Sequence, residues 1–151
     1  MGLLNLASGA SMWRGYEYYK GKKVVSCQKN GNAEIKGTVS GSGGARYEVF
    51  LDIEHPRNSH CNCPHADGRR VVCKHMVALY FSAFPAEAKA YYQRVLDNEK
   101  RMEQQEEEWR KAVISHVSHM RKEELKKALL DILFYGPDWQ YNQFIRDYVD
   151  R

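Results

Sequence analysis

Residues 61–75 read CNCPHADGRRVVCKH, and this segment holds three of the four cysteines in the chain. Two pairs within it share one spacing, because a single residue separates Cys61 from Cys63 and Cys73 from His75. Three thiolates and one imidazole form a donor set that closes a tetrahedral zinc site. The spacing therefore predicts one structural Zn2+ ion bound by Cys61, Cys63, Cys73 and His75.

Three further histidines, His55, His60 and His65, lie near these pairs. A histidine-rich surface loop with isolated cysteines, or a catalytic Cys–His pair, would use the same residue types. The regular pairing favours zinc over both interpretations. We prefer His75 as the fourth ligand because its spacing repeats that of the first pair. A closed four-ligand site has no open position for water, so we expect no hydrolysis at the metal.

The composition of the chain limits its class. Its 151 residues are 43% hydrophobic and 12% aromatic, which is enough for one domain, or one small domain with an appendage. No apolar run reaches the roughly 18 residues needed to span a bilayer, and the first ten residues lack the features of a secretory signal. Clustered cysteines in such a chain favour metal binding over disulfides, so we expect a cytoplasmic protein without a membrane or small-molecule partner. Cys27 is expected to be an inert thiol on a strand.

The charge of the chain is uneven. Residues 1–85 hold eleven Lys and Arg against six Asp and Glu, whereas residues 86–151 hold twelve against thirteen. With three thiolates and one Zn2+ included, the first part keeps a net charge of about +4. This charge permits nucleic-acid binding, although an ordinary solvated surface explains it nearly as well.

The residues before the ligand pairs predict a helix and a small antiparallel sheet. Apolar residues at helical spacing run over residues 3–19, with Ser11 as a candidate N-cap. Alternation over residues 22–39 around an Asn-Gly pair predicts a hairpin, and residues 46–53 predict a third strand. We expect the aromatic residues of the helix to cover this sheet rather than to stack on bases.

The residues after the first pair predict helices. An apolar pattern at helical spacing begins near Cys73 and ends near Pro85. The N-terminus of that helix would favour the thiolate form of Cys73 that zinc requires. Residues 86–116 predict a long polar helix, interpreted as a solvated face rather than a short coiled coil. Residues 121–135 and the segment after Pro137 predict a helical hairpin.

Together these patterns predict an α+β fold in two parts. Residues 1–85 form the zinc-binding module, with its N-terminal helix, three-stranded sheet and zinc-finger helix, and residues 86–151 form an α-helical tail. Metal binding is expected to support folding directly, because so small a sheet and helix bury little apolar area alone. No converging nucleophile, base and orienting group is visible, so we expect no enzymatic activity.

The pattern C-x-C-x(n)-C-x-H followed by an apolar helix resembles the SWIM zinc finger. The four ligand positions of that family are matched one by one, by Cys61, Cys63, Cys73 and His75. Residues 14–24 are similar to the region that precedes the finger in bacterial SWIM-containing proteins. Residues 123–130 resemble a segment that follows it in some of them.

The resemblance implies a role in DNA binding or protein interaction, because SWIM fingers accompany Swi/Snf-type helicase-ATPases, transposase-like proteins and recombination-accessory proteins. The chain shows no Walker A phosphate loop, so any ATPase is expected to be another protein. We expect DNA or another nucleic acid as the partner, with phosphates contacted by the basic residues that bracket the metal site, Arg57, Arg69, Arg70 and Lys74. The alternative is a protein-interaction adaptor that docks through its C-terminal helices onto a partner such as a helicase-type ATPase.

Overall fold

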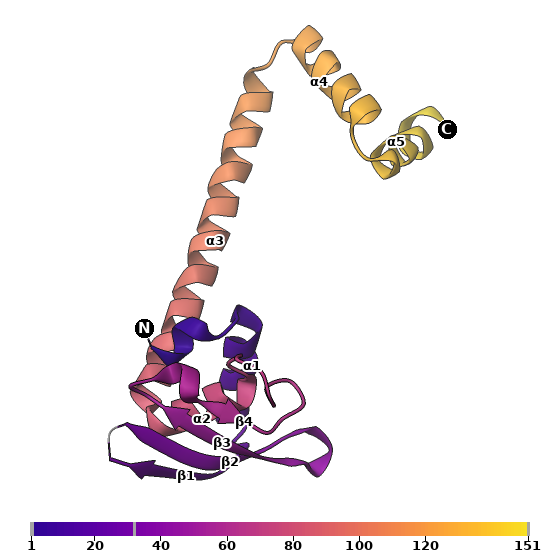
Figure 1. Ribbon diagram of the computed structural model, residues 1–151. Coiled ribbons are helices and arrows are strands. Elements are labelled where there is room, and N and C mark those ends of the chain that lie inside the picture. Colours follow the sequence, from indigo (N-terminus) through magenta and orange to yellow (C-terminus); the bar gives the residue numbers. More distant parts are fainter. Residues whose placement is uncertain (1, 32, 151) are drawn as a thin grey trace. The chain divides into compact units, whose positions relative to one another are not determined.

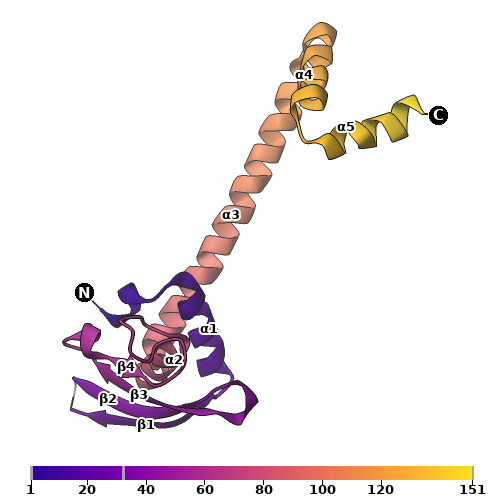
Figure 2. The same cartoon turned by 45° about the vertical axis from the view of Figure 1, so that its right-hand side comes forward.

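The computed structural model describes residues 2–31 and 33–150 (Figure 1, Figure 2). Its first elements are a 3-10 turn (Leu3–Leu6), α1 (Gly9–Lys20), β1 (Val24–Asn30), β2 (Glu34–Ser40), a 3-10 turn (Ser42–Gly44), β3 (Arg46–Asp52), a 3-10 turn (Pro56–Asn58), β4 (His60–Cys61) and α2 (Lys74–Ala83). The later elements are α3 (Pro85–His119), α4 (Lys122–Tyr135), α5 (Asp138–Phe144) and a π-helical turn (Ile145–Val149). The predicted α+β class is confirmed.

The chain divides into two compact units, Met1–Leu96 and Asp97–Arg151, and the division falls inside α3. The first turns of α3 belong to the first unit because Ala88 is buried there and Tyr91 packs against its core. The sequence places the boundary between zinc module and tail after residue 85, one residue inside α3, whereas the two compact units divide after Leu96.

The strands of the first unit form one antiparallel sheet in the order β1-β2-β3-β4. The sequence predicts the first three strands and misses β4, because two residues are too few to show an alternating pattern. Strand β4 pairs with β3 through Val49–Cys61 and Phe50–His60. The short strand therefore places the first predicted metal ligand at the edge of the sheet.

One face of the sheet packs against α2 (Figure 1). Its buried residues alternate along the two central strands, with Ile35, Gly37 and Val39 in β2 and Val49 and Leu51 in β3. Helix α2 is buried along most of its length because the sheet lies on one side of it and α1 on another. The core of the first unit therefore centres on α2.

The aromatic residues of α1 face helices rather than the sheet. The rings of Tyr16 and Tyr19 each lie 6.1 Å from the ring of Phe81 in α2, measured between centroids. Tyr16 also stacks on Tyr92 of α3, at 5.1 Å and an interplanar angle of 8°. These rings are packing residues, but the expectation that they cover the sheet is wrong.

Helix α1 starts earlier than the candidate cap at Ser11 implies. Ser8 is the N-cap, and its hydroxyl oxygen accepts a hydrogen bond of 3.2 Å from the backbone N–H of Ser11. Gly15, which weakens the helical pattern in the sequence, is needed for packing. A Cβ atom at this position would overlap the side chain of Val77, so the glycine allows α1 to approach α2 closely.

The second unit contains little internal packing. None of the described residues from 97 to 150 is buried. Helix α4 begins with a capping box, in which the backbone N–H of Arg121 donates to the carboxylate of Glu124 at 2.8 Å. Helices α4 and α5 contact each other, and the rings of Phe134 and Tyr141 are 6.1 Å apart.

No helix within the described residues combines the length and the apolar character needed to cross a membrane.

We expect Gly15→Ala to lower the stability of the first unit by about 1–3 kcal/mol, the usual cost of overpacking a well-packed core. Urea denaturation of the zinc-loaded chain measures this difference. Gly9→Ala is the matched control, because nothing lies within 4 Å of its Cβ position and alanine favours a helix. Equal stability of the two variants would contradict the close contact between the helices.

Candidate metal centre

Four ligand side chains converge in the core of the first unit: Cys61, Cys63, Cys73 and His75. Their ligand atoms all lie within 4.8 Å of one another. The Nδ1 atom of His75 is 3.7 Å from the sulfur of Cys61 and 3.9 Å from that of Cys73. Bonds of about 2.3 Å from zinc to sulfur and about 2.0 Å to nitrogen place neighbouring tetrahedral ligands about 3.5–3.8 Å apart. The donor set and spacing therefore fit one structural zinc ion.

Local structure explains how the two pairs meet. Cys61 ends β4, and Cys63 follows in a turn where the backbone N–H groups of Ala66 and Asp67 both donate to its carbonyl oxygen at 2.9 Å. This turn reverses the chain and begins its return to α2. Cys73 is the N-cap of α2, and His75 lies in the first turn of that helix.

Burial separates the four ligands from the remaining cysteine and histidines. The ligands are only 1–3% exposed, and their cysteines form no disulfide. Cys27 is exposed on β1, as expected for a thiol outside the site. His55, His60 and His65 are exposed and lie outside the cluster. A buried, four-ligand arrangement suits a structural ion rather than one that activates water.

The start of α2 stabilises a thiolate. The pKa of Cys73 lies well below its ordinary value, first because the Cys61 thiol donates a hydrogen bond to it. The His75 ring and the backbone N–H groups of Met76 and His75 add to this effect. The pKa of Cys61 is raised, because its thiol donates the shared hydrogen bond and is buried. The N–H groups at the helix start thus favour an anionic ligand, as the sequence predicts.

Two tyrosine rings orient the histidine ligand. The Tyr18 ring from α1 meets the His75 ring edge-on at 5.5 Å, and the Tyr47 ring from β3 lies 4.6 Å away. The Nε2 atom of His75 is buried and has no hydrogen-bond partner within the described chain. Ring packing therefore holds this imidazole, whereas metal-bound histidines commonly donate their second N–H to a polar group. No spacing rule in the sequence indicates either tyrosine.

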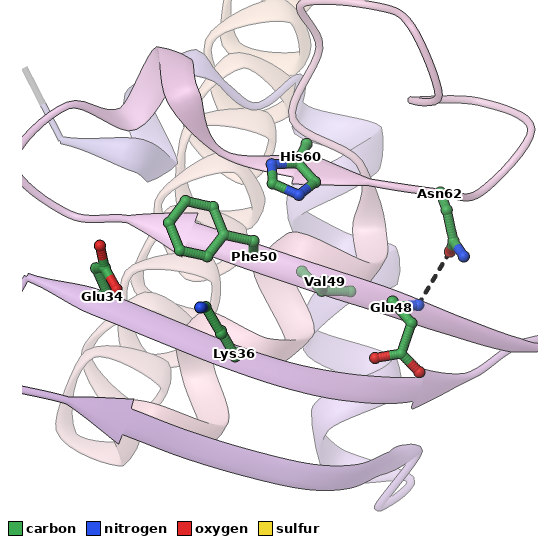
Figure 3. Close-up of a pocket in the computed structure, with 7 residues that line it drawn as sticks. All are labelled: Glu34, Lys36, Glu48, Val49, Phe50, His60 and Asn62. Carbon is green, nitrogen blue, oxygen red and sulfur yellow. Dashed lines mark hydrogen bonds between the residues drawn. The ribbon is translucent and has the colours of Figure 1, made fainter.

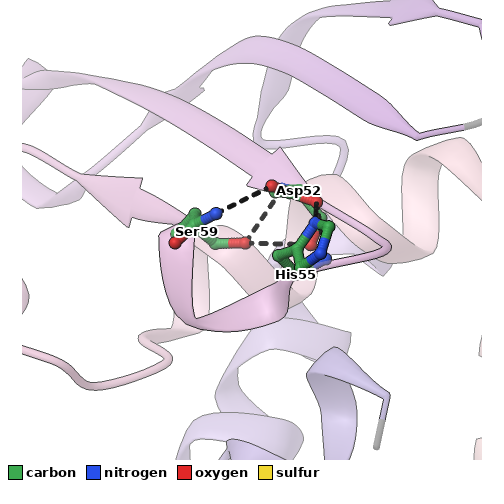
Figure 4. A network of polar contacts seen from close by, with 4 residues as sticks. Asp52, His55 and Ser59 are labelled. Atoms are coloured by element: carbon green, nitrogen blue, oxygen red, sulfur yellow. Dashed lines mark hydrogen bonds and ion pairs between the residues drawn. The ribbon is translucent and has the colours of Figure 1, made fainter.

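A polar network fixes the loop that leads into the first pair (Figure 4). The carboxylate of Asp52, at the end of β3, accepts hydrogen bonds from the backbone N–H of His55 at 2.6 Å and the side-chain amide of Asn58 at 3.1 Å. These bonds lower the pKa of Asp52. The backbone N–H of Asp52 donates to the hydroxyl of Ser59 at 3.0 Å. The loop is thus closed immediately before β4.

The basic residues predicted to contact phosphates occupy different places. Arg57 and Arg70 line one cleft of about 270 Å3, together with Leu6, Val71 and Val72. Arg69 is exposed in the turn after Gly68. Lys74 lies at the start of α2, where its ammonium group is 4.4 Å from the centre of the Tyr18 ring.

The Lys74 side chain also lines a second cleft, again of about 270 Å3, together with Arg14 of α1. Arg14 lies sixty residues earlier in the sequence than Lys74, so no local motif joins the two. The contact between α1 and α2 brings them together.

The fold and donor set define a structural zinc finger in which one metal ion joins a sheet edge to the start of a helix. Residues 47–84 match the model of the SWIM zinc finger family, and this segment of the chain is a SWIM zinc finger. The match runs from β3 to the end of α2 and includes all four ligands, which confirms the resemblance of the ligand pattern. The resemblances of residues 14–24 and 123–130 lie outside the matched segment. A SWIM zinc finger is a structural module, not a catalytic one. No curated protein and no solved structure matches the chain significantly.

We expect the chain to carry one zinc ion, and Cys73→Ser to lose both the ion and the fold of the first unit. Zinc binding supplies about 10–16 kcal/mol in small zinc domains, more than so small a core can replace. Elemental analysis measures the metal, and circular dichroism measures the fold. Cys27→Ser is the matched control and should keep one ion. Full zinc content and a native spectrum in Cys73→Ser would refute the assignment.

Proposed function

We propose that the SWIM zinc finger binds DNA and that the chain is a non-enzymatic accessory of a DNA-processing machine. The cleft shared by Arg57 and Arg70 carries the proposal. Arg57 lies in the 3-10 turn before β4, and Arg70 lies between the two ligand pairs. Since the folding of the zinc loop brings them to one cleft, metal binding and the proposed DNA contact are linked.

The positive charges around the finger are available to a ligand. Over residues 2–31 and 33–150, no carboxylate forms an ion pair with Arg57, Arg69, Arg70 or Lys74. Arginine presents a planar fork of N–H donors that matches phosphate oxygens in a bidentate manner. Unpaired arginines in a cleft therefore suit a phosphate backbone. Arg14 and Lys74 offer a further basic position of the same kind.

The proposed role as an accessory of a DNA-processing machine rests on the SWIM family and on the sequence. The chain shows no Walker A loop, so the machine would draw nucleotide hydrolysis from another protein, such as a helicase-type ATPase. The reduced thiols that zinc requires suit the cytoplasm.

We expect the double variant Arg57→Ala with Arg70→Ala to bind duplex DNA more weakly than the unaltered chain. The slope of log affinity against log salt concentration should become shallower by about 2, because two phosphate contacts are lost. Fluorescence anisotropy over a range of salt concentrations measures the slope.

The control variant is Lys100→Ala with Arg110→Ala, which removes the same charge from α3. These two side chains also form no ion pair within the described residues. A slope that changes equally in both variants would show nonspecific attraction. No DNA binding by the unaltered chain at low salt would exclude the proposed function.

The second unit favours a further candidate function, that of an adaptor for a protein partner. Its helices expose large apolar side chains to an extent that isolated surface residues do not explain. The exposed fractions include 66% for Trp109, 45% for Leu129, 54% for Ile132, 63% for Phe134 and 62% for Trp139. Under this proposal a helicase-type ATPase or a similar protein covers α4 and α5.

We expect Leu129→Gln with Ile132→Gln to abolish capture of such a partner by the full chain. Both side chains are about half exposed, so the variant should keep its zinc and its helix content. Affinity capture with mass spectrometry, followed by reconstitution with the purified partner, measures the loss. The Arg57→Ala, Arg70→Ala variant is the control and should retain the partner. Undiminished capture by the glutamine variant would remove this candidate.

A further inference from the structure

The face of the sheet opposite α2 carries a groove of about 590 Å3 (Figure 3). No described element of the first unit covers this face. The side chains of Lys36, Phe50 and His60 point away from α2 into this groove, and its lining also includes Glu34, Glu48, Val49 and Asn62. It is separate from the metal site, because none of the four ligands lines it.

Two rings form the floor of the groove. Phe50 of β3 and His60 of β4 are direct partners in the strand register, and their ring centroids are 5.1 Å apart at an interplanar angle of 33°. The ammonium group of Lys36, from β2, lies 5.5 Å from the centre of the Phe50 ring. Aromatic rings with a nearby cation on an open sheet form a surface on which an unstacked nucleobase packs.

Hydrogen bonds fix the polar groups at one end of the groove. The backbone N–H of Glu48 donates to the side-chain oxygen of Asn62 at 2.9 Å, which holds the Asn62 side chain beside β3. The hydroxyl of Thr38 donates to the Glu48 carboxylate at 3.1 Å. This end of the groove therefore presents a held carboxylate acceptor, a kind of group that accepts from the edge of a base.

The charges of the groove restrict what enters it. Glu34 and Glu48 oppose the single charge of Lys36, so a phosphate group is disfavoured inside. A basic peptide is disfavoured at the rings, because Lys36 already occupies the cation position near Phe50. A neutral base avoids both conflicts, and an exocyclic amino group such as that of cytosine donates to a carboxylate.

We propose that this groove binds one unstacked base of a single-stranded nucleic acid, with its ring on Phe50 and His60 and its amino group at Glu48. The inference rests on the proposed nucleic-acid binding and adds to it. The arginines of the finger contact phosphates, whereas the sheet distinguishes amino-bearing bases from thymine.

The test uses the full zinc-loaded chain with labelled oligo-dC, oligo-dT, a short duplex and an arginine-rich peptide, each followed by fluorescence anisotropy at fixed salt. Oligo-dC should bind more tightly than oligo-dT. Phe50→Leu keeps the bulk of the side chain and removes the ring, so it should weaken oligo-dC binding about tenfold or more while duplex binding is unchanged. Phe50→Tyr should restore the affinity. Glu48→Gln should reduce the preference for oligo-dC.

The outcomes separate this inference from the proposed function. Equal oligo-dC binding by Phe50→Leu and the unaltered chain overturns the inference, while salt-dependent duplex binding through Arg57 and Arg70 still stands. No binding of any nucleic acid overturns both. Phe50-dependent binding of an arginine-rich peptide, without oligo-dC binding, overturns the inference in favour of a protein ligand. If Phe50→Leu loses zinc or stability, His60→Ala, at an exposed side chain, tests the same ring pair.

Discussion

Coordination of one zinc ion by three sulfur atoms and one imidazole nitrogen is the constraint on which the first unit depends. The ligands come from the end of β4, the turn after it and the start of α2. Without the ion, only weak hydrogen bonds join Cys61, Cys73 and His75. The metal bonds keep a strand of two residues against β3 and fix the first turn of α2. Because α2 contacts both the sheet and α1, the ion organises all three layers.

The sheet has two faces of different chemistry, and its register sets both. Side chains alternate along a strand, so the same pairing that buries Val49 and Leu51 exposes Phe50. A shift of one residue would exchange the faces and destroy the core. The outer groove is therefore specified by the residues that build the interior. The finger adds a third surface, the cleft lined by Arg57 and Arg70, which lies outside the sheet.

Local patterns in the sequence predict much of this architecture, and contacts between distant residues account for what they miss. The spacing of Cys61, Cys63, Cys73 and His75 predicts the zinc ligands. The alternation of apolar and polar residues predicts strands β1 to β3. The sequence does not reveal β4, because it exists only through its pairing with β3. It assigns the tyrosines of α1 to the wrong partner, since periodicity shows that a face is apolar and not what covers it. The fold likewise brings Arg57 and Arg70 to one cleft and places Phe50 beside His60, which no local pattern in the sequence indicates.

The burial of the ligands also governs how fast the metal exchanges with solution. No ligand side chain is more than 3% exposed. Although Cys63, Cys73 and His75 line the cleft that Arg14 and Lys74 share, a chelator or an oxidant reaches the sulfurs mainly when the core opens transiently. Loss of zinc and thiol oxidation then follow the frequency of that opening, not the rate of collision. The time for which zinc stays bound therefore reports how often the core of the first unit opens.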